Sequence, residues 1–146
     1  MYKLTEETKT IGSITLHRIE LIKDCRWGSK GDKGGWIQKE INLQQGAWVS
    51  GNAKVYGDAQ VSGDAKVSGN AQVYGDAWEF SPLQIQGTKH YFNICKIGYI
   101  KIGCIEKSID DWEKQFEQIG KEKGYTKEQI NEYKLYIQLA KKLWRN

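Results

Sequence analysis

Residues 45–80 read QGAWVS GNAKVY GDAQVS GDAKVS GNAQVY GDAWEF, which are six consecutive hexapeptides. The third position is alanine in all six, and the fifth is valine in the first five. A fixed period of six, with a small and a β-branched residue two positions apart, is typical of short strands stacked as repeats. We therefore expect this hexad repeat to decide the fold.

Alternation along each hexapeptide predicts which side chains face the interior. Alanine and valine point inward, whereas Lys54, Gln60, Lys66 and Gln72 point outward. The Asn or Asp after each glycine suits a tight corner. Each hexapeptide is thus expected to form one strand and one corner. If three sides close a coil, the repeat makes about two coils of a parallel β-helix, and flanking segments must cover its open ends.

The flanking sequences predict caps on both sides, so the fold class is mainly β with C-terminal α. We divide the chain into residues 1–36 (strand and Gly-rich loop), 37–80 (repeat), 81–107 (antiparallel meander of three strands) and 108–146 (helical hairpin). Counting back in sixes from Val49 reaches Leu43 and Ile37, so the register begins before the repeat itself. Ser108 with Asp111, and Thr126 with Gln129, predict the helix starts. The second helix carries an apolar stripe of Ile130, Tyr133, Ile137, Ala140 and Trp144.

Composition argues against several classes of function. The net charge is +4, without a polybasic stripe, so we do not expect nucleic-acid binding. The three cysteines are widely spaced and suggest neither a disulfide framework nor a zinc site. No apolar run is long enough for a membrane span, and no signal peptide is apparent. We expect a protein of the reducing cytoplasm.

Written from the interior valine, V-[SY]-G-[ND]-A-x resembles the left-handed β-helix repeat of hexapeptide acyltransferases. Glycine comes one position later than is common there, a variant similar to the repeats of transferases of the YdcK type. A wider resemblance is to short phage and prophage proteins of unknown role. It covers Leu16 to Ile19, Gly31-Asp32, Gly34 to Leu43, the repeat, Gly103-Cys104 and the helices from Ser108. This resemblance implies a short left-handed β-helix, no established catalytic residues and the cytoplasm of a bacterial host.

The acyltransferase alternative lacks its usual histidine. That family places a catalytic histidine on a coil or its loop, whereas His17 precedes the repeat and His90 follows it. We therefore predict no catalytic residues and no enzymatic activity. Asp58, Asp64 and Asp76 follow glycines, where corner geometry explains them, so we predict neither a metal site nor a cofactor.

Cationic and aromatic residues outside the repeat are the candidate ligand-binding residues. Such a set can hold an anionic, ring-bearing ligand such as a nucleotide through charge-assisted hydrogen bonds and stacking. The competing interpretation is that the aromatic residues cap the repeat and the lysines are solvated. The candidates are Arg18, Arg26, Trp27, Lys30, Trp36, Lys89, His90 and Tyr91.

Tyr56 and Tyr74 lie three hexads apart and should stack on one outer face. We predict that they contact a neighbouring subunit in a homo-oligomer, and the resemblance favours a trimer. The leading hypothesis is a non-enzymatic phage-type binding protein active in counter-defence, which sequesters a host signalling nucleotide or blocks a host immune protein. The alternatives are a small acyltransferase and a structural accessory protein with no ligand.

Overall fold

The computed structural model describes residues 1–143 of the chain. The chain divides into two compact units, the first ending at Pro82 and the second beginning at Leu83. In chain order the first unit contains β1 (Tyr2–Ile11), β2 (Ile14–Leu21), β3 (Lys33–Ile37), a 3-10 turn (Glu40–Asn42), β4 (Trp48–Val49), β5 (Lys54–Val55), β6 (Gln60–Val61), β7 (Lys66–Val67), β8 (Gln72–Val73) and β9 (Ala77–Trp78). The second contains β10 (Gln84–Gln86), β11 (Tyr91–Lys96), β12 (Tyr99–Ile102), β13 (Ile105–Ser108), α1 (Ile109–Glu122) and α2 (Lys127–Leu143).

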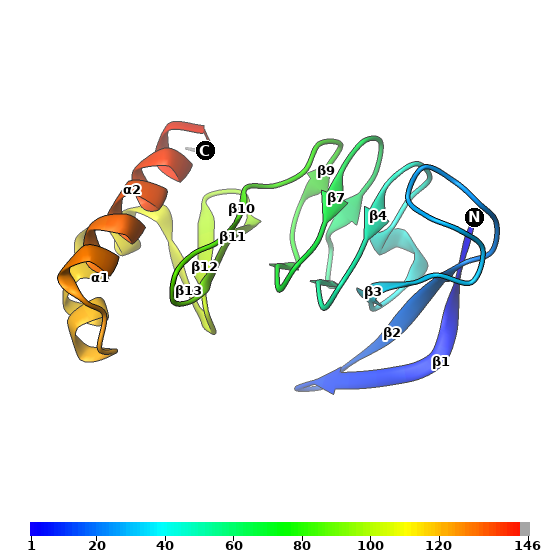
Figure 1. Cartoon of the computed structure of the whole chain (residues 1–146), viewed down its shortest axis with the longest axis horizontal. Helices are drawn as coiled ribbons and strands as arrows, with labels where there is room; N and C mark the ends of the chain where they lie inside the picture. Colours follow the sequence, from blue (N-terminus) through cyan, green and yellow to red (C-terminus); the bar gives the residue numbers. More distant parts are fainter. Residues whose placement is uncertain (144–146) are drawn as a thin grey trace. The chain divides into compact units, whose positions relative to one another are not determined.

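Strands of the repeat pair in parallel with strands three hexads away (Figure 1). Val49 lies beside Val67 and Val55 beside Val73, and every repeat valine is fully buried. The register predicted for the preceding segment is confirmed, because Ile37 pairs with Val55 and Leu43 bridges to Val61. The interior is therefore a set of stacked aliphatic columns, in which each member lies three hexads after the one below it.

The prediction of a left-handed β-helix is wrong. Each strand of the repeat is two residues long, and glycine corners with positive φ, such as Gly51 and Gly57 (both +61°), end it at once. The strands consequently fall into separate sheets, ordered β1-β2-β3-β5-β8, β4-β7 and β6-β9. No closed or solenoid sheet forms within residues 1–143. The coarser prediction, mainly β with C-terminal helices, is confirmed.

The last hexapeptide departs from the period. Gln60 pairs with Ala77 and Val61 with Trp78, so the pairing falls one position short of three full hexads. Asp76 has a φ of +71° and is the non-glycine residue with positive φ among those described. Trp78 is 3% exposed and takes the place of the inward valine, whereas Ala77 is exposed. The larger apolar side chain thus occupies the interior position, where its burial contributes more.

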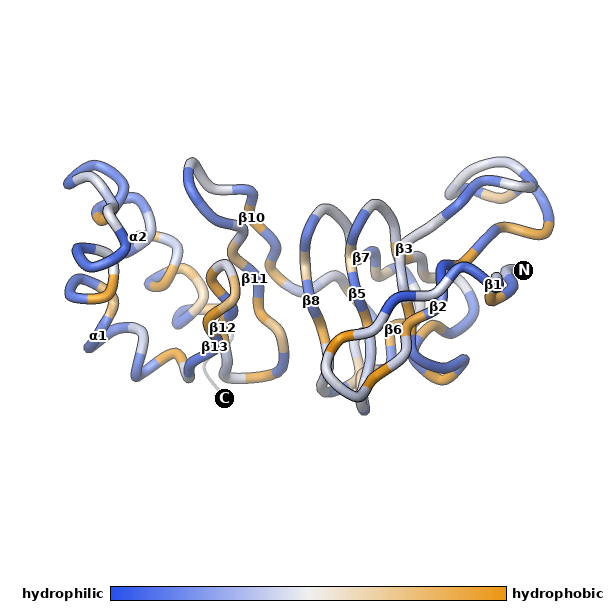
Figure 2. The backbone as a smooth tube through the Cα atoms, turned by 90° about the horizontal axis from the view of Figure 1, so that it is seen from below, coloured by the Kyte–Doolittle hydropathy of each residue, from blue (hydrophilic) through white to orange (hydrophobic). Residues whose placement is uncertain are grey.

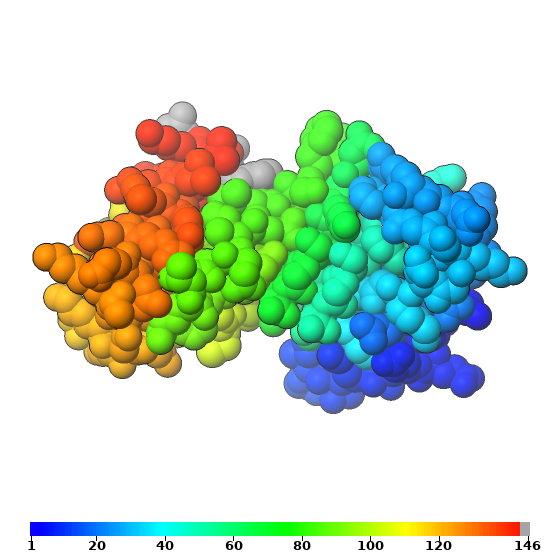
Figure 3. Space-filling view, viewed as in Figure 1, coloured from blue at the N-terminus to red at the C-terminus, as the bar shows by residue number. Residues whose placement is uncertain are grey.

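The N-terminal segment forms a hairpin that the sequence did not predict in full. β1 pairs antiparallel with β2, with a register shift between Leu4 and Thr8, and β2 pairs antiparallel with β3. Most β1 side chains are exposed or half-buried, and this charged edge strand carries little apolar periodicity. On the face shown in Figure 3, the blue atoms of this segment lie directly against the cyan and green atoms of the repeat.

The second unit is a four-stranded antiparallel sheet with two helices. The predicted three strands become four because Gly103 (φ +59°) and Cys104 form a two-residue turn that pairs Ile102 with Ile105. Both predicted helix starts are confirmed, as the Ser108 hydroxyl accepts from the Asp111 amide and Thr126 and Gln129 bond reciprocally.

The two helices are amphipathic, and hydrophobic and hydrophilic stretches alternate along them in Figure 2. The predicted stripe of α2 is buried at Ile130, Tyr133, Ile137 and Ala140. Trp144, which was predicted on the same stripe, lies outside the described residues.

Candidate functional site

Three neighbouring strands place a row of candidate side chains around Trp36. Arg18 on β2 pairs with Trp36 on β3, which in turn pairs with Lys54 on β5. Lys9 on β1 lies with its ammonium 4.2 Å from the centre of the Trp36 ring, and the Arg18 guanidinium lies 5.0 Å from that centre. We call Lys9, Arg18, Trp36 and Lys54 the Trp36 cluster.

Two glycines hold β3 close enough to the repeat for this row to form. A Cβ atom at Gly34 would lie 2.6 Å from both the Trp48 ring and the Val49 carbonyl oxygen. At Gly35 it would lie 2.7 Å from the Ala53 carbonyl oxygen. Residues without a Cβ are therefore required here, and they bury the Trp36 side chain to 5% exposure.

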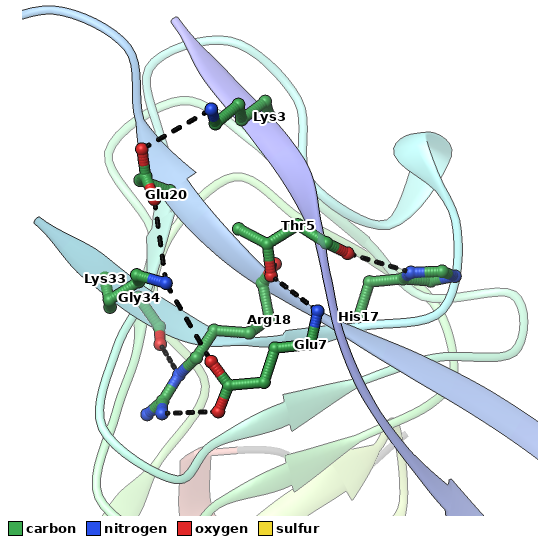
Figure 4. A network of polar contacts seen from close by, with 8 residues as sticks. All are labelled: Lys3, Thr5, Glu7, His17, Arg18, Glu20, Lys33 and Gly34. Carbon is green, nitrogen blue, oxygen red and sulfur yellow. Dashed lines mark hydrogen bonds and ion pairs between the residues drawn. The ribbon is translucent and has the colours of Figure 1, made fainter. Parts of the chain in front are cut away.

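The acidic groups of the hairpin are already shared among several cations (Figure 4). Glu20 lies 3.6 Å from Lys3 and 3.6 Å from Lys33, and Glu7 lies 3.8 Å from Lys33 and 3.4 Å from Arg18. Arg18 also donates from Nε to the Gly34 carbonyl oxygen at 3.1 Å. This chain of alternating charges fixes the Arg18 side chain. Both carboxylates are occupied by it, so neither pairs with Lys9 or Lys54.

Two ammonium groups and one indole N–H of the cluster have no acidic partner. Among the described residues, neither Lys9 nor Lys54 lies within ion-pair distance of a carboxylate; Lys54 donates to the Asn52 carbonyl. Burial lowers the pKa of Lys54, and the nearby Lys9 charge lowers it further. The buried Nε1 of Trp36 has no hydrogen-bond acceptor in the described part of the chain. The two ammonium groups, which are only half-buried, can therefore still donate to an anion, whereas the indole N–H is shielded within the cluster.

The other N-terminal candidates hold the loop onto the repeat. Arg26 donates to the carbonyls of Gly46 (2.8 Å) and Gly63 (3.1 Å), and Trp27 Nε1 donates to Gly46 (2.8 Å). Arg26 also lies 3.0 Å from Asp64 and 4.5 Å from the centre of the Trp27 ring. Lys30 is exposed, and its backbone amide donates to Asp24. The structure thus brings Arg26 and Trp27 together at the corners, where their hydrogen bonds serve packing.

Cations lie over both candidate tryptophan rings. Lys9 and Arg18 contact Trp36, and Arg26 and Lys66 contact Trp27. Stacking of a ligand ring on either indole would require these cations to move. Ligand binding in this unit would therefore depend on charge and hydrogen bonding rather than on stacking.

The remaining candidates, Lys89, His90 and Tyr91, lie in the second unit where β11 begins. His90 Nδ1 lies 2.6 Å from the Tyr125 hydroxyl oxygen, and the Lys89 ammonium lies 5.5 Å from the centre of the Tyr125 ring. Burial, together with the charges of Lys89 and Lys123, lowers the pKa of His90, and burial raises the pKa of Tyr91. Sequence reasoning missed Tyr125, because its contact with His90 joins residues far apart in the chain.

The predicted tyrosine pair is stacked within the chain. The rings of Tyr56 and Tyr74 have their centres 5.1 Å apart with an angle of 26° between their planes, and both are half-buried. The Tyr56 hydroxyl lies 3.4 Å from the Gln72 side-chain oxygen. The pair therefore covers one outer face of the repeat, and its contact with a second subunit stays a prediction.

The other histidine, His17, contacts the backbone of β1. His17 Nδ1 lies 3.3 Å from the Thr5 carbonyl oxygen. Within residues 1–143, no three His, Cys, Asp or Glu side chains gather as a metal site. In the same range, no helix has the length and apolar character needed to cross a membrane.

Lys9 and Lys54 were not among the predicted site residues. The place of Lys54 beside Trp36 could have been predicted from the sequence. The two residues are three hexads apart, and strands of the repeat pair at that spacing. The place of Lys9 over the Trp36 ring could not have been predicted, since it depends on the register shift in the hairpin of β1 and β2. Searches of protein-family models and of curated proteins found no match to this chain.

Proposed function

We propose that this protein is a non-enzymatic binding protein that captures a small phosphate-bearing molecule at the Trp36 cluster. The observation that carries the proposal is the gathering of Lys9 and Lys54 at a buried indole whose N–H has no acceptor among the described residues, while the nearby carboxylates are engaged elsewhere. Two neighbouring ammonium groups attract an anion, and an anion with several acceptor oxygens can accept from both.

Phosphate fits the cluster better than a single carboxylate does. A phosphate group offers three or more acceptor oxygens and up to two charges, which matches two ammonium groups and a guanidinium. Arg18 is held by Gly34 and Glu7, so its position is set before a ligand arrives. The specific form of the hypothesis is a phage-type protein that sequesters a host signalling nucleotide. That form rests on the resemblance to phage proteins and on this charge arrangement.

Calorimetric titration with pyrophosphate, ATP and cyclic dinucleotides tests the proposal, with adenosine as the probe that lacks phosphate. At least one phosphate probe should bind and adenosine should not, and added salt should weaken binding because the contacts are ionic. Binding of adenosine equal to that of ATP would show that charge is not the determinant. If none of the phosphate probes binds, the proposal fails.

Lys54→Gln and Lys66→Gln form a matched pair of variants. Both lysines occupy the fourth position of a hexapeptide, but Lys54 belongs to the cluster. A charged hydrogen bond contributes roughly 1.5–3 kcal/mol, so Lys54→Gln should weaken binding by about tenfold or more. Lys66→Gln should change it by less than about twofold, as expected for a charge remote from the ligand. Equal losses in the two variants would refute this location.

A further inference from the structure

A cavity of about 60 Å³ lies within the second unit, between the sheet and α1. Its walls are mainly apolar. Trp112, Phe116 and Ile119 line it from α1, and Ile102 and Ile105 line it from the hairpin whose turn is Gly103-Cys104. Trp112 is anchored by a 2.8 Å hydrogen bond from Nε1 to the Ile100 carbonyl, so this wall is fixed in place.

The size of the cavity limits what can enter. Its volume exceeds the roughly 30 Å³ that a water molecule occupies in the liquid, and it is well below the roughly 150 Å³ of a cavity that binds benzene. A branched or short alkyl group fits, whereas a purine does not. The nucleotide chemistry proposed for the first unit therefore does not apply here.

The polar rim carries positive charge. His90, Lys123 and Tyr125 line the cavity, and Lys89 lies over the Tyr125 ring. No carboxylate is among the lining side chains, and neither lysine is ion-paired within the described range. The charge of Glu132 acts on Tyr125, but this carboxylate does not line the cavity and accepts from Thr88 and from Tyr136. The rim thus offers donors to an anion at the mouth of an apolar space.

We propose that this cavity binds a small branched or short-chain carboxylate, with its alkyl group against Trp112 and Phe116 and its carboxylate at the Lys123 and His90 rim. An alkyl group gains by leaving water for these walls. The carboxylate remains at the rim, where an ammonium and an imidazole can donate to it. This site is independent of the proposed function, because it belongs to the other unit and requires neither Lys9 nor Lys54.

NMR titration of the full chain with isobutyrate tests the proposal, with isobutyramide as the neutral probe of the same shape. The indole N–H resonance of Trp112, assigned with Trp112→Phe, should shift with isobutyrate and saturate. The shift with isobutyramide should require a concentration higher by about threefold or more, since it lacks the charge. No shift with isobutyrate, or equal affinity for both probes, overturns the proposal.

Two variants and a control locate the site. Lys123→Gln should weaken isobutyrate binding by about threefold, whereas Lys121→Gln, whose lysine pairs with Glu117, should leave it unchanged within about twofold. Ile105→Phe fills the cavity and should abolish the Trp112 shift. An unfolding midpoint for each variant shows that it is folded, and a Trp112 shift that persists in folded Ile105→Phe would place the ligand elsewhere.

Discussion

The hydroxyl of Tyr133 forms three hydrogen bonds with the segment that leads into β11. It accepts from the amides of Lys89 (3.1 Å) and His90 (2.7 Å), and it donates to the His90 carbonyl oxygen. Tyr133 is fully buried on α2, so a single side chain ties the sheet to a helix that is distant in the sequence. The position of the His90 ring therefore depends on this tie.

Replacing Tyr133 by Phe should destabilise the protein. The ring stacking against Phe116 is retained, but two amides lose their acceptor. Loss of these part-buried hydrogen bonds should cost about 0.5–1.5 kcal/mol each, which should lower the urea midpoint of unfolding at an unchanged m-value. Tyr99→Phe is the control, because Tyr99 is exposed and its hydroxyl makes no hydrogen bond among the described residues. Equal midpoints for the two variants would contradict this role.

Stability should depend on pH through His90. The pKa of His90 in the folded protein lies below its usual value of 6.5, because of burial and the charges of Lys89 and Lys123. At a pH between the folded and the unfolded pKa of His90, the unfolded state binds more protons than the folded state. The contribution of neutral His90 to the free energy of unfolding is therefore complete above pH 6.5 and is lost as the pH falls through the folded pKa. Urea titrations from about pH 5.5 to 7.5 should show this slope, and His90→Gln should reduce it.

The Lys123→Gln variant provides the complementary check on His90. Removing one of the two neighbouring charges should raise the pKa of His90, which an NMR titration of the imidazole resonance measures. Lys114→Gln, an exposed position on α1, is the control. A pKa that stays constant in Lys123→Gln would show that this charge does not act on the ring.

Asn42 is predicted to be intolerant of aspartate. Its side chain is fully buried, donates to the carbonyls of Gly57 (3.2 Å) and Ala59 (2.8 Å), and accepts from the Lys39 amide (3.0 Å). Asn42→Asp keeps the shape but replaces the donor that faces two carbonyl oxygens with an acceptor. The expected cost at neutral pH is about 3 kcal/mol or more.

Chemical unfolding at pH 7 and at about pH 5 tests the Asn42 prediction. Burial beside carbonyls should raise the pKa of the new carboxyl, so part of the lost stability should return at the lower pH. Asn52→Asp, at an exposed corner of the repeat, should stay within about 0.5 kcal/mol of the parent. A loss at position 42 no larger than that at position 52 would show that the buried amide is dispensable.

The double variant Tyr56→Ser with Tyr74→Ser tests the predicted oligomer. If the stacked pair contacts a neighbouring subunit in a trimer, light scattering should show the mass falling to that of one chain. The exposed Tyr99→Ser is a control that should leave the mass unchanged. A double variant with the mass of the parent would limit these tyrosines to packing within the chain.

Much of the interior could be predicted from the sequence because its period is strict. Ile37 and Leu43 were placed by counting in sixes, and both pair as the count requires. The shape of the sheets was not predictable, because a period fixes which strands are neighbours without fixing how far each strand extends beyond its corner. The Gly103-Cys104 turn was missed since Ile100, Ile102 and Cys104 continue the alternation of a single strand.

The candidate site was only partly predictable. Arg18 and Trp36 were identified from composition, and the pairing of β2 with β3 brings them together. Arg26 and Trp27 were identified on the same grounds, yet they bind the carbonyls of Gly46 and Gly63. Composition shows which groups can bind an anion. It does not show which of them the backbone has already engaged.

The pairing of columns three hexads apart also governs how such a chain can change length. Because Ile37, Val55 and Val73 form one column, a tandem duplication of three hexapeptides would return every later residue to its own column. A duplication of one or two hexapeptides would instead move each later hexapeptide to a different column. Descendants of this gene should therefore gain or lose hexapeptides in threes.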